Sequence, residues 1–314
     1  MPALTALLRN IVDYAGLFPP AGLELPKVVE NYAEYTLSPH SWILGRLIIP
    51  VKQLASFAEF ARPFWEAENF GERLPWNISC LLPAPDTINE SFAKAWEVIV
   101  EFNSKNQGLA IVDAVETKAD SPESVRLGAA HCEQSINVFW ELPHAKPLVD
   151  SFSAILAAGP NHRAKIRTGG VQARLIAPAR EVAQFLSECA VAEVAFKATA
   201  GLHHPIRNEY ALTYEPNSEC ATMHGFLNVF VAAVMGWTHK LSAAEVLPIL
   251  SCRDPLHFEF REDAVVWRDL QATVAQVEAA RNNFAISFGS CSFGEPIEDL
   301  QRLNFLAQTK ELTR

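Results

Sequence analysis

A lysine inside an apolar, strand-like segment is the strongest chemical signal in the sequence. Lys197 lies in residues 194–199 (VAFKAT), and the two-residue alternation of a strand places Thr199 on the same side. Such a lysine is either paired with a carboxylate or desolvated, and desolvation lowers its pKa until the neutral amine can attack a carbonyl carbon. Lys197 is therefore predicted to form a Schiff base with a small carbonyl substrate, or else to lie in a buried ion pair with Glu141 or Glu116.

A second lysine is followed by an arginine two residues further along. Lys165 and Arg167, in AKIRTGGV, point to the same side of a strand, and two neighbouring cations favour a bound anion. The alternative is a structural pairing with carboxylates of an adjacent strand. Gly169 and Gly170 follow directly, and glycine lets the backbone approach a ligand closely or turn with positive φ. We expect these four residues and Thr199 to bind an anionic substrate, with Lys165 also among the catalytic groups.

Glu141 and two adjacent histidines are the candidates for moving protons. Glu141 ends the run FWEL, so it is either a general acid or base at a strand end or a carboxylate emerging into solvent. His203 and His204 open the long connection 202–221, which has the length of a lid or binding loop and carries Arg207 as a further substrate-binding candidate. Each histidine can act as acid or base or supply one metal ligand, but neither has a carboxylate at a recognisable metal spacing. No metal and no cofactor is predicted.

Further polar side chains are expected near the same pocket. His224 begins an apolar helix and shares a face with Asn228, so it either looks into the pocket or is a hydrogen-bonded core histidine. Ser290 and Ser292 follow the last predicted strand, where barrels often cradle a phosphate with amides and hydroxyls. Cys291 lies between them without an evident base, which argues against a thiol nucleophile.

These residues lie at the ends of different apolar runs, so many strands must position them. Eight such runs alternate with amphipathic helical patterns, at residues 46–51, 77–82, 109–117, 137–142, 164–168, 194–199, 256–267 and 284–289. The alternation predicts an α/β fold, a (β/α)8 TIM-type barrel whose reactive residues come from the C-terminal strand ends. A doubly wound open sheet is the alternative, although no G-x-G-x-x-G follows a strand. The seventh run can equally form a hairpin turning at residues 261–263.

The first 45 residues are predicted to lie outside the barrel proper. Residues 1–45 read as a helical, proline-fixed N-terminal lead-in packed on a single barrel domain of residues 46–314. Arg46 opens the first predicted strand and is expected to form an ion pair at the bottom of the barrel. On the third predicted strand, Asp113, Glu116 and Lys118 are acid and base candidates of lower rank.

Two segments resemble class I aldolases of the deoxyribose-phosphate aldolase kind. Residues 197–202 (KATAGL) resemble the K-[ST]-x-T-G-[FL] segment that carries the Schiff-base lysine of that family. Residues 165–171 (KIRTGGV) resemble its K-x-x-G-G-[VI] segment with a second, pKa-lowering lysine, although here this segment has one extra residue and comes first. The resemblance covers about 15 of 314 residues and implies a barrel with a lysine-bearing anion pocket. LFPPAG, KIRTGG and FKATAGLHHP together also resemble a bacterial family of (β/α)8 barrels, which supplies a fold but no function.

Composition excludes several classes of protein. The net charge of −10, without any basic run, argues against a nucleic-acid partner, and 49% hydrophobic residues are enough for a packed core. The longest apolar stretch, residues 225–237, is too short to cross a membrane, and the N-terminus has no recognisable export signal. Six scattered cysteines without a C-x-x-C pair favour free thiols in the cytoplasm. The expected partners are a small anionic substrate and, at a subunit contact, further copies of the chain.

Together these features predict an enzyme acting on a small anionic carbonyl compound, a sugar phosphate or an oxo acid, by aldol-type cleavage or formation. One alternative is a metal-dependent lyase or isomerase that uses His203, His204 and Glu141. The other is a catalytically silent barrel that acts as a binding protein. A metal assay on the purified protein distinguishes the first alternative. The silent barrel differs from an enzyme in whether the cations of the two lysine-bearing strands face an open pocket or are neutralised by carboxylates.

Overall fold

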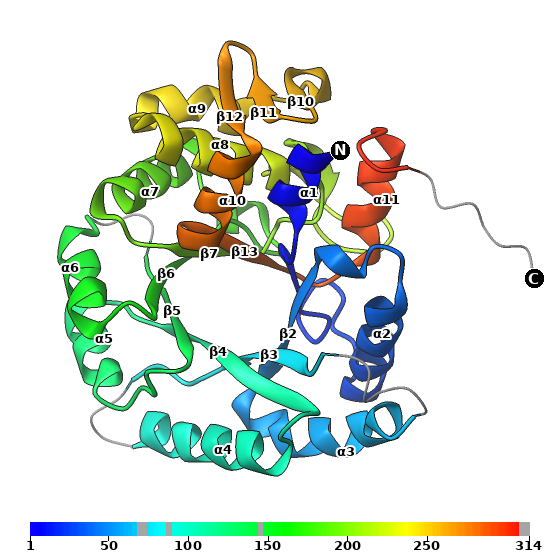
Figure 1. Ribbon diagram of the computed structural model, residues 1–314, viewed down its shortest axis with the longest axis vertical. Helices are drawn as coiled ribbons and strands as arrows, with labels where there is room; N and C mark the ends of the chain where they lie inside the picture. The colour runs from blue at the N-terminus through cyan, green and yellow to red at the C-terminus, as the bar shows by residue number, and fades with distance from the viewer. Residues whose placement is uncertain (68–73, 86–89, 144–146, 308–314) are drawn as a thin grey trace, which may run out of the picture.

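Eight parallel strands close into a barrel, as the alternating pattern predicts. The computed structural model describes residues 1–67, 74–85, 90–143 and 147–307. Around the closed ring the strands follow chain order (Figure 1): β1 (Val12–Tyr14), β2 (Leu44–Pro50), β3 (Trp76–Leu81), β4 (Ala110–Lys118), β5 (Asn137–Glu141), β6 (His162–Arg167), β7 (Phe196–Thr199) and β13 (Ala285–Ser290). The protein is therefore a (β/α)8 barrel, in which all strand C-termini meet at one end.

Helices form a ring outside the strands (Figure 1). They are α1 (Pro2–Leu8), α2 (Leu25–Leu37), α3 (Leu54–Trp65), α4 (Ser91–Lys105), α5 (Pro122–Ala129), α6 (Val149–Ala158), α7 (Ala179–Ala192), α8 (Phe226–His239), α9 (Ala243–Ser251), α10 (Val274–Asn283) and α11 (Gly294–Arg302). Their apolar faces pack on the strands, so one hydrophobic core runs from Ala3 to Leu300. The charged faces remain in solvent, as expected for amphipathic helices.

The first barrel strand lies in the segment assigned from sequence to a helical lead-in. β1 pairs with β2 on one side and with β13 on the other, so it closes the barrel. Residues 1–45 therefore contribute a barrel strand as well as helices, and a boundary at residue 46 would cut through the barrel. The strand is only three residues long and has Asp13 at its centre, so neither apolar periodicity nor strand propensity reveals it.

Residues 256–267 lie outside the barrel, so the interpretation of this run as the seventh barrel strand is wrong and the hairpin alternative is confirmed. β10 (Phe258–Phe260) and β11 (Ala264–Trp267) pair antiparallel, and β12 (Leu270–Thr273) adds a third strand. This small sheet lies near α8, α9 and α10 at the edge of the molecule (Figure 1). The charged residues 261–263 turn the chain between β10 and β11, where they remain exposed.

The apolar stretch 225–237 forms α8, a buried helix that packs against α7, α9 and α10. Its one polar residue in the buried part is Asn228, which donates to the carbonyls of Ile249 and Cys252 at 2.8 Å each. Asn228 also accepts from the backbone N–H of Arg207 at 2.7 Å, so the buried amide is satisfied. Within the described ranges, no helix has the length and apolar character that crossing a membrane requires.

Two arginines link helices and strands toward the N-terminal ends of the barrel strands. Arg46 of β2 and Asp113 of β4 form a bidentate ion pair with both distances at 2.7 Å, as expected for Arg46. The pairing holds Asp113 away from the C-terminal ends of the strands, so this acid-base candidate lies far from the barrel mouth. Arg281 donates to the carbonyls of Leu7 and Arg9 at 2.8 and 3.0 Å and joins α10 to the end of α1.

Candidate active site

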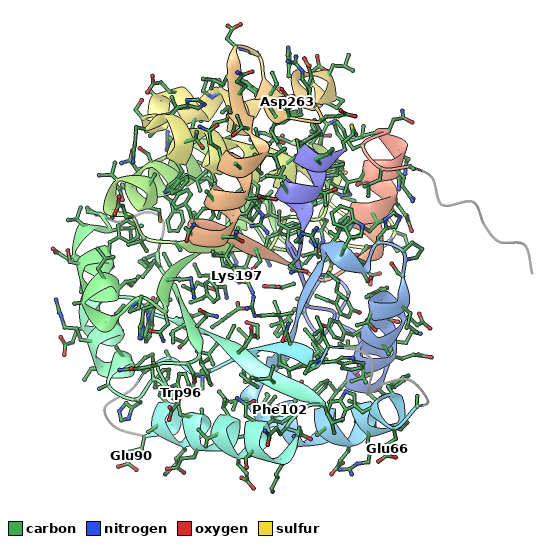
Figure 2. All side chains as sticks on the ribbon, viewed as in Figure 1. Glu66, Glu90, Trp96, Phe102, Lys197 and Asp263 are labelled. Carbon is green, nitrogen blue, oxygen red and sulfur yellow. The ribbon has the colours of Figure 1, made fainter. Side chains whose placement is uncertain are left out.

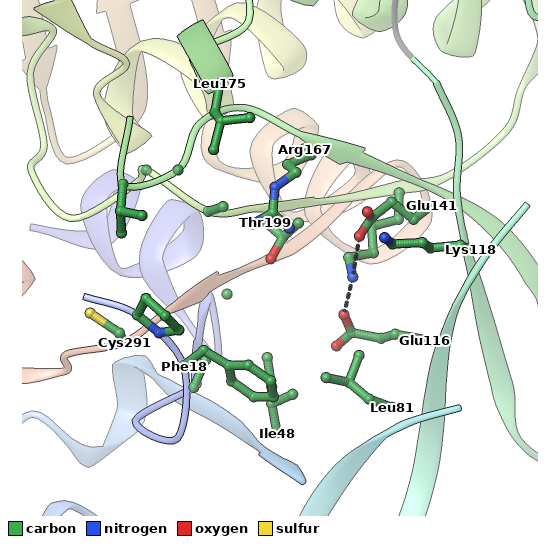
Figure 3. A pocket seen from close by; sticks show the side chains of 18 of the residues that line it. Phe18, Ile48, Leu81, Glu116, Lys118, Glu141, Arg167, Leu175, Thr199 and Cys291 are labelled. Atoms are coloured by element: carbon green, nitrogen blue, oxygen red, sulfur yellow. Dashed lines mark ion pairs between the residues drawn. The ribbon is translucent and has the colours of Figure 1, made fainter. Parts of the chain in front are cut away.

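A cavity of about 500 Å³ opens at the C-terminal ends of the barrel strands (Figure 3). This is the end at which barrel enzymes bind their substrates, and the volume is that of a small-molecule site. The titratable and hydroxyl side chains among its lining come from β4 to β7 and from the segments after β7 and β13: Glu116, Thr117, Lys118, Glu141, Lys165, Arg167, Thr199, His203 and Cys291.

Lys165 supplies a primary amine to the cavity wall. Its Nζ lies 2.8 Å from Glu116 Oε2 and 2.8 Å from Glu141 Oε2, and these two ion pairs are the dashed lines in Figure 3. Burial is the largest single effect and lowers the pKa of Lys165, but the charges of Glu116 and Glu141 outweigh it and raise that pKa above its ordinary value. The resting side chain is thus an ammonium paired with two carboxylates.

Lys197 is paired with Lys165 in the register of β6 and β7, but it lies in the barrel interior (Figure 2) and not in the cavity lining. Its side chain is 0% exposed, and its Nζ lies 2.5 Å from Asp13 Oδ2 and 2.5 Å from Glu116 Oε1. Of the two readings of Lys197, the structure contains the buried ion pair, with Glu116 as the partner expected and Asp13 as a second one. Of the two lysines, Lys165 lines the cavity and Lys197 does not.

Glu116 joins the two lysines. One oxygen binds Lys197 and accepts from Ser79 Oγ at 2.7 Å, while the other binds Lys165. Burial, the largest effect, raises the pKa of Glu116, yet the two ammonium charges hold that pKa well below its usual range. Charges therefore alternate from the barrel interior to the cavity, through the five side chains that we call the charge chain: Asp13, Lys197, Glu116, Lys165 and Glu141.

Asp13 is the member of the charge chain that sequence reasoning missed. It accepts from Ser287 Oγ at 2.7 Å and from the backbone N–H of Arg46 at 2.8 Å, so β13 and β2 both hold it in place. It is a lone charge in the apolar run 11–15, which is the same signal that identified Lys197. Because a buried charge needs a partner, two lone charges of opposite sign in apolar runs could have been matched from sequence.

Two cations at the cavity mouth have no counterion among the residues that the structure describes. Arg167 and Lys118 line the cavity and are exposed, and neither side chain makes an ion pair or hydrogen bond with another described residue. The sequence predicts Arg167 to bind an anion, whereas it makes Lys118 only an acid-base candidate of lower rank. Thr199, which the strand register pairs with Arg167, also lines the cavity. The mouth can therefore attract an anionic group.

The two glycines after β6 have different surroundings. Gly170 lines the cavity, as expected for a residue near the ligand. Gly169 does not, because its backbone packs on Gly201: a Cβ at Gly169 would lie 3.1 Å from the Cα of Gly201. Gly201 itself has φ +73°, which disfavours any other residue there. Gly169 thus permits a close approach of two strand ends rather than contact with a ligand.

The adjacent histidines have separate environments. His203 lines the cavity with its Nδ1 3.6 Å from Cys291 Sγ, so this cysteine does have a histidine beside it, contrary to the sequence interpretation. Burial lowers the pKa of His203 to about 4 and raises the pKa of the Cys291 thiol, so the pair is neutral and the thiolate is disfavoured. His204 lies outside the lining, 2.5 Å from Asp299 Oδ2 and stacked on Tyr210.

Arg207, His224, Ser290 and Ser292 also lie outside the cavity lining. His224 is 1% exposed, and its Nε2 lies 2.7 Å from the Ala177 carbonyl oxygen while its Nδ1 lies 3.1 Å from Arg207 Nη1. It therefore fits the alternative of a core histidine. The hydroxyls of Ser290 and Ser292 accept from the backbone N–H groups of Ser292 and Glu295, at 3.4 and 3.1 Å. Ser290 Oγ also lies 3.4 Å from Nδ1 of His203, so it contacts a residue of the cavity lining without lining the cavity itself.

No His, Cys, Asp and Glu side chains gather in threes or more to form a metal-binding group anywhere in the part of the chain that the structure describes. The site is thus defined by its lysines: the protein is a (β/α)8 barrel with a buried, carboxylate-flanked amine at its C-terminal mouth. No family model, no curated protein and no solved structure matches the chain. Its chemistry therefore has to be inferred from the residues of the cavity.

Proposed function

We propose that the protein is an enzyme that forms an imine between Lys165 and a small anionic carbonyl compound, and so makes or breaks a carbon–carbon bond next to that carbonyl. The observation that carries the proposal is the placement of Lys165 on the cavity wall: its amine is paired with Glu116 and Glu141, yet it faces an open cavity, and Glu141 can accept its proton. Arg167 and Lys118 at the mouth, which have no ion-pair partner in the described part of the chain, support an anionic substrate.

The chemistry begins with a proton transfer from the Lys165 ammonium to Glu141, which is the more exposed of its two partners, at 13% against 1% for Glu116. The neutral amine adds to the carbonyl carbon, and the carbonyl oxygen takes up protons and leaves as water, which gives the imine. Protonation of the imine nitrogen draws electrons from the adjacent carbon, so a bond to that carbon can be formed or broken. Glu141 is placed to return the proton at each stage.

The inner part of the charge chain supports this reaction without meeting the substrate. Lys197 and Ser79 keep one oxygen of Glu116 occupied, so that only the other oxygen is turned to Lys165. Such preorganisation fixes the amine in one position. All six cysteines are free thiols, which supports the cytoplasm as the compartment of this proposed reaction.

The proposal is tested by trapping the imine. Wild-type protein is incubated with pyruvate, 2-oxobutanoate, glyoxylate and glyceraldehyde 3-phosphate, sodium borohydride is added, and intact mass is measured. We expect at least one compound to give a reduced adduct, and Lys165→Met to lose it completely because the nucleophile is gone. Lys52→Met, at an exposed position that does not line the cavity, should retain the adduct.

Two outcomes would contradict the proposal. An adduct that survives in Lys165→Met would place the reactive amine elsewhere. The absence of any adduct, with the compounds still binding, would favour the alternative of a barrel that binds its ligand without reacting.

The yield of trapped adduct should rise with pH, because only the neutral amine of Lys165 reacts and its pKa is raised by Glu116 and Glu141. Glu141→Gln removes one of these two negative charges, so it should lower the pKa of Lys165 and move the midpoint of the trapping profile to lower pH. The measurement is the initial trapping rate from pH 6 to 10. Glu123→Gln, exposed on α5, should leave the midpoint in place, and an upward shift in Glu141→Gln would refute the electrostatic account.

A further inference from the structure

The cavity has two chemically different walls. One carries the charged residues of β4 to β6, and the other, formed by the segment after β1 and by the ends of β2 and β3, is apolar: Phe18, Pro19, Pro20, Ile48, Leu81 and Leu82. Figure 3 shows Phe18, Ile48 and Leu81 grouped below the charged residues, with Glu116 between the two groups and Arg167 and Lys118 on the far side. A ligand that fills the cavity touches both walls.

From this division we infer that the substrate is an oxo acid with an apolar chain, and not a polyhydroxylated sugar phosphate; the inference rests on the proposed function. The carbonyl carbon lies at Lys165, the carboxylate is turned to Arg167 and Lys118, and the chain lies against Phe18, Ile48 and Leu81.

The apolar wall distinguishes the two substrate classes. Each methylene group of a ligand that leaves water to pack on this wall increases the affinity of that ligand. A sugar hydroxyl placed there would lose its bonds to water, and none of the six side chains of the wall has a polar group to replace them. A site of this kind therefore favours a hydrocarbon chain over a hydroxylated one.

The charge of the site favours a carboxylate over a phosphate. Among the residues that the structure describes, Lys118, Lys165, Lys197 and Arg167 carry four positive charges, and Asp13, Glu116 and Glu141 carry three negative ones, so this set has one positive charge in excess. This excess matches a monoanion. Ser290 and Ser292, whose hydroxyls were expected to cradle a phosphate, do not line the cavity: both hydroxyls accept from backbone N–H groups, and that of Ser290 also contacts His203.

Carboxylates that lack a ketone or aldehyde group test this inference separately from imine formation, because they can bind in the cavity but cannot form an imine. Dissociation constants of acetate, butanoate, hexanoate, inorganic phosphate and ribose 5-phosphate are measured by calorimetry on the full chain. Affinity is expected to rise about fourfold for each methylene group added between acetate and hexanoate. Hexanoate should bind more tightly than either phosphate compound.

Two variants of cavity residues and one control show which wall binds the chain and which binds the carboxylate. Leu81→Ser makes the apolar wall polar and should flatten the dependence on chain length, whereas Leu256→Ser, which is 82% exposed and outside the cavity, should leave it intact. Arg167→Gln should weaken all three carboxylates by a similar factor, because it removes a cation that contacts the group they share.

The outcomes separate the inference from the proposed function. Equal affinities along the series, or tighter binding of ribose 5-phosphate than of hexanoate, would overturn the oxo-acid class even if Lys165 forms an imine with some other compound. The expected series together with a failure of every oxo acid to be trapped would support the ligand class and overturn the imine-forming function alone.

Discussion

Replacing Lys197 with methionine is expected to lower the free energy of unfolding by about 3–5 kcal/mol, as is usual when one partner of a buried ion pair is removed. The substitution keeps the apolar stem but leaves Asp13 and Glu116 without the cation that both contact at 2.5 Å. Both carboxylates are 1% exposed, so water cannot compensate for the loss. Urea unfolding at pH 7 measures the change.

One control variant and one double variant test whether the loss of stability comes from the buried ion pairs. Lys52→Met changes an exposed lysine in the same way and should stay within about 0.5 kcal/mol of wild type. Combining Lys197→Met with Asp13→Asn should recover part of the stability, because one of the uncompensated charges disappears with its partner. A loss below about 1 kcal/mol for Lys197→Met alone would show that the ion pairs do not persist in solution.

Arg281→Met is expected to cost at least about 3 kcal/mol, since hydrogen bonds made by charged groups contribute about 1.5–3 kcal/mol each. Arg281 is 7% exposed and donates to the carbonyls of Leu7, Arg9, Ala285 and Ile286. These carbonyls belong to the end of α1 and to β13. Without Arg281, α1 and β13 would no longer be held together here, and the barrel would close less tightly at β1.

Thermal and urea unfolding of Arg281→Met and of Arg180→Met, which is exposed on α7, would measure this effect. The control should unfold like wild type. Equal stability of both variants would mean that the four carbonyls find other donors and that α1 does not depend on the arginine.

The features that the sequence predicts well are those with a regular pattern. Seven of the eight runs proposed as barrel strands do form barrel strands, because each combines apolar side chains with a following helix. Lys165 and Lys197 were identified for the same reason: a charge inside an apolar run stands out. The run 256–267 has the same composition, and only its charged residues 261–263 indicate that it turns back on itself.

What the sequence could not show is which lysine meets the cavity. Lys165 and Lys197 are neighbours in the strand register, and their roles differ because Asp13 reaches Lys197 from β1, 184 residues away in the chain. The apolar wall was missed for another reason. Ile48, Leu81 and Leu82 end apolar strands, so from sequence they look like any other core residues until the cavity beside them is seen.

Within the charge chain, the residues that stabilise the barrel are different from those that a ligand can reach. Its inner members, Asp13 and Lys197, are closed off from ligand and anchor strands β1, β4 and β7, whereas its outermost carboxylate, Glu141, is partly exposed. Changes at Glu141 can therefore retune the acidity of Lys165 while the inner ion pairs stay intact. In evolutionary terms, a barrel built in this way can change the residues of its cavity without losing the ion pairs that stabilise its fold.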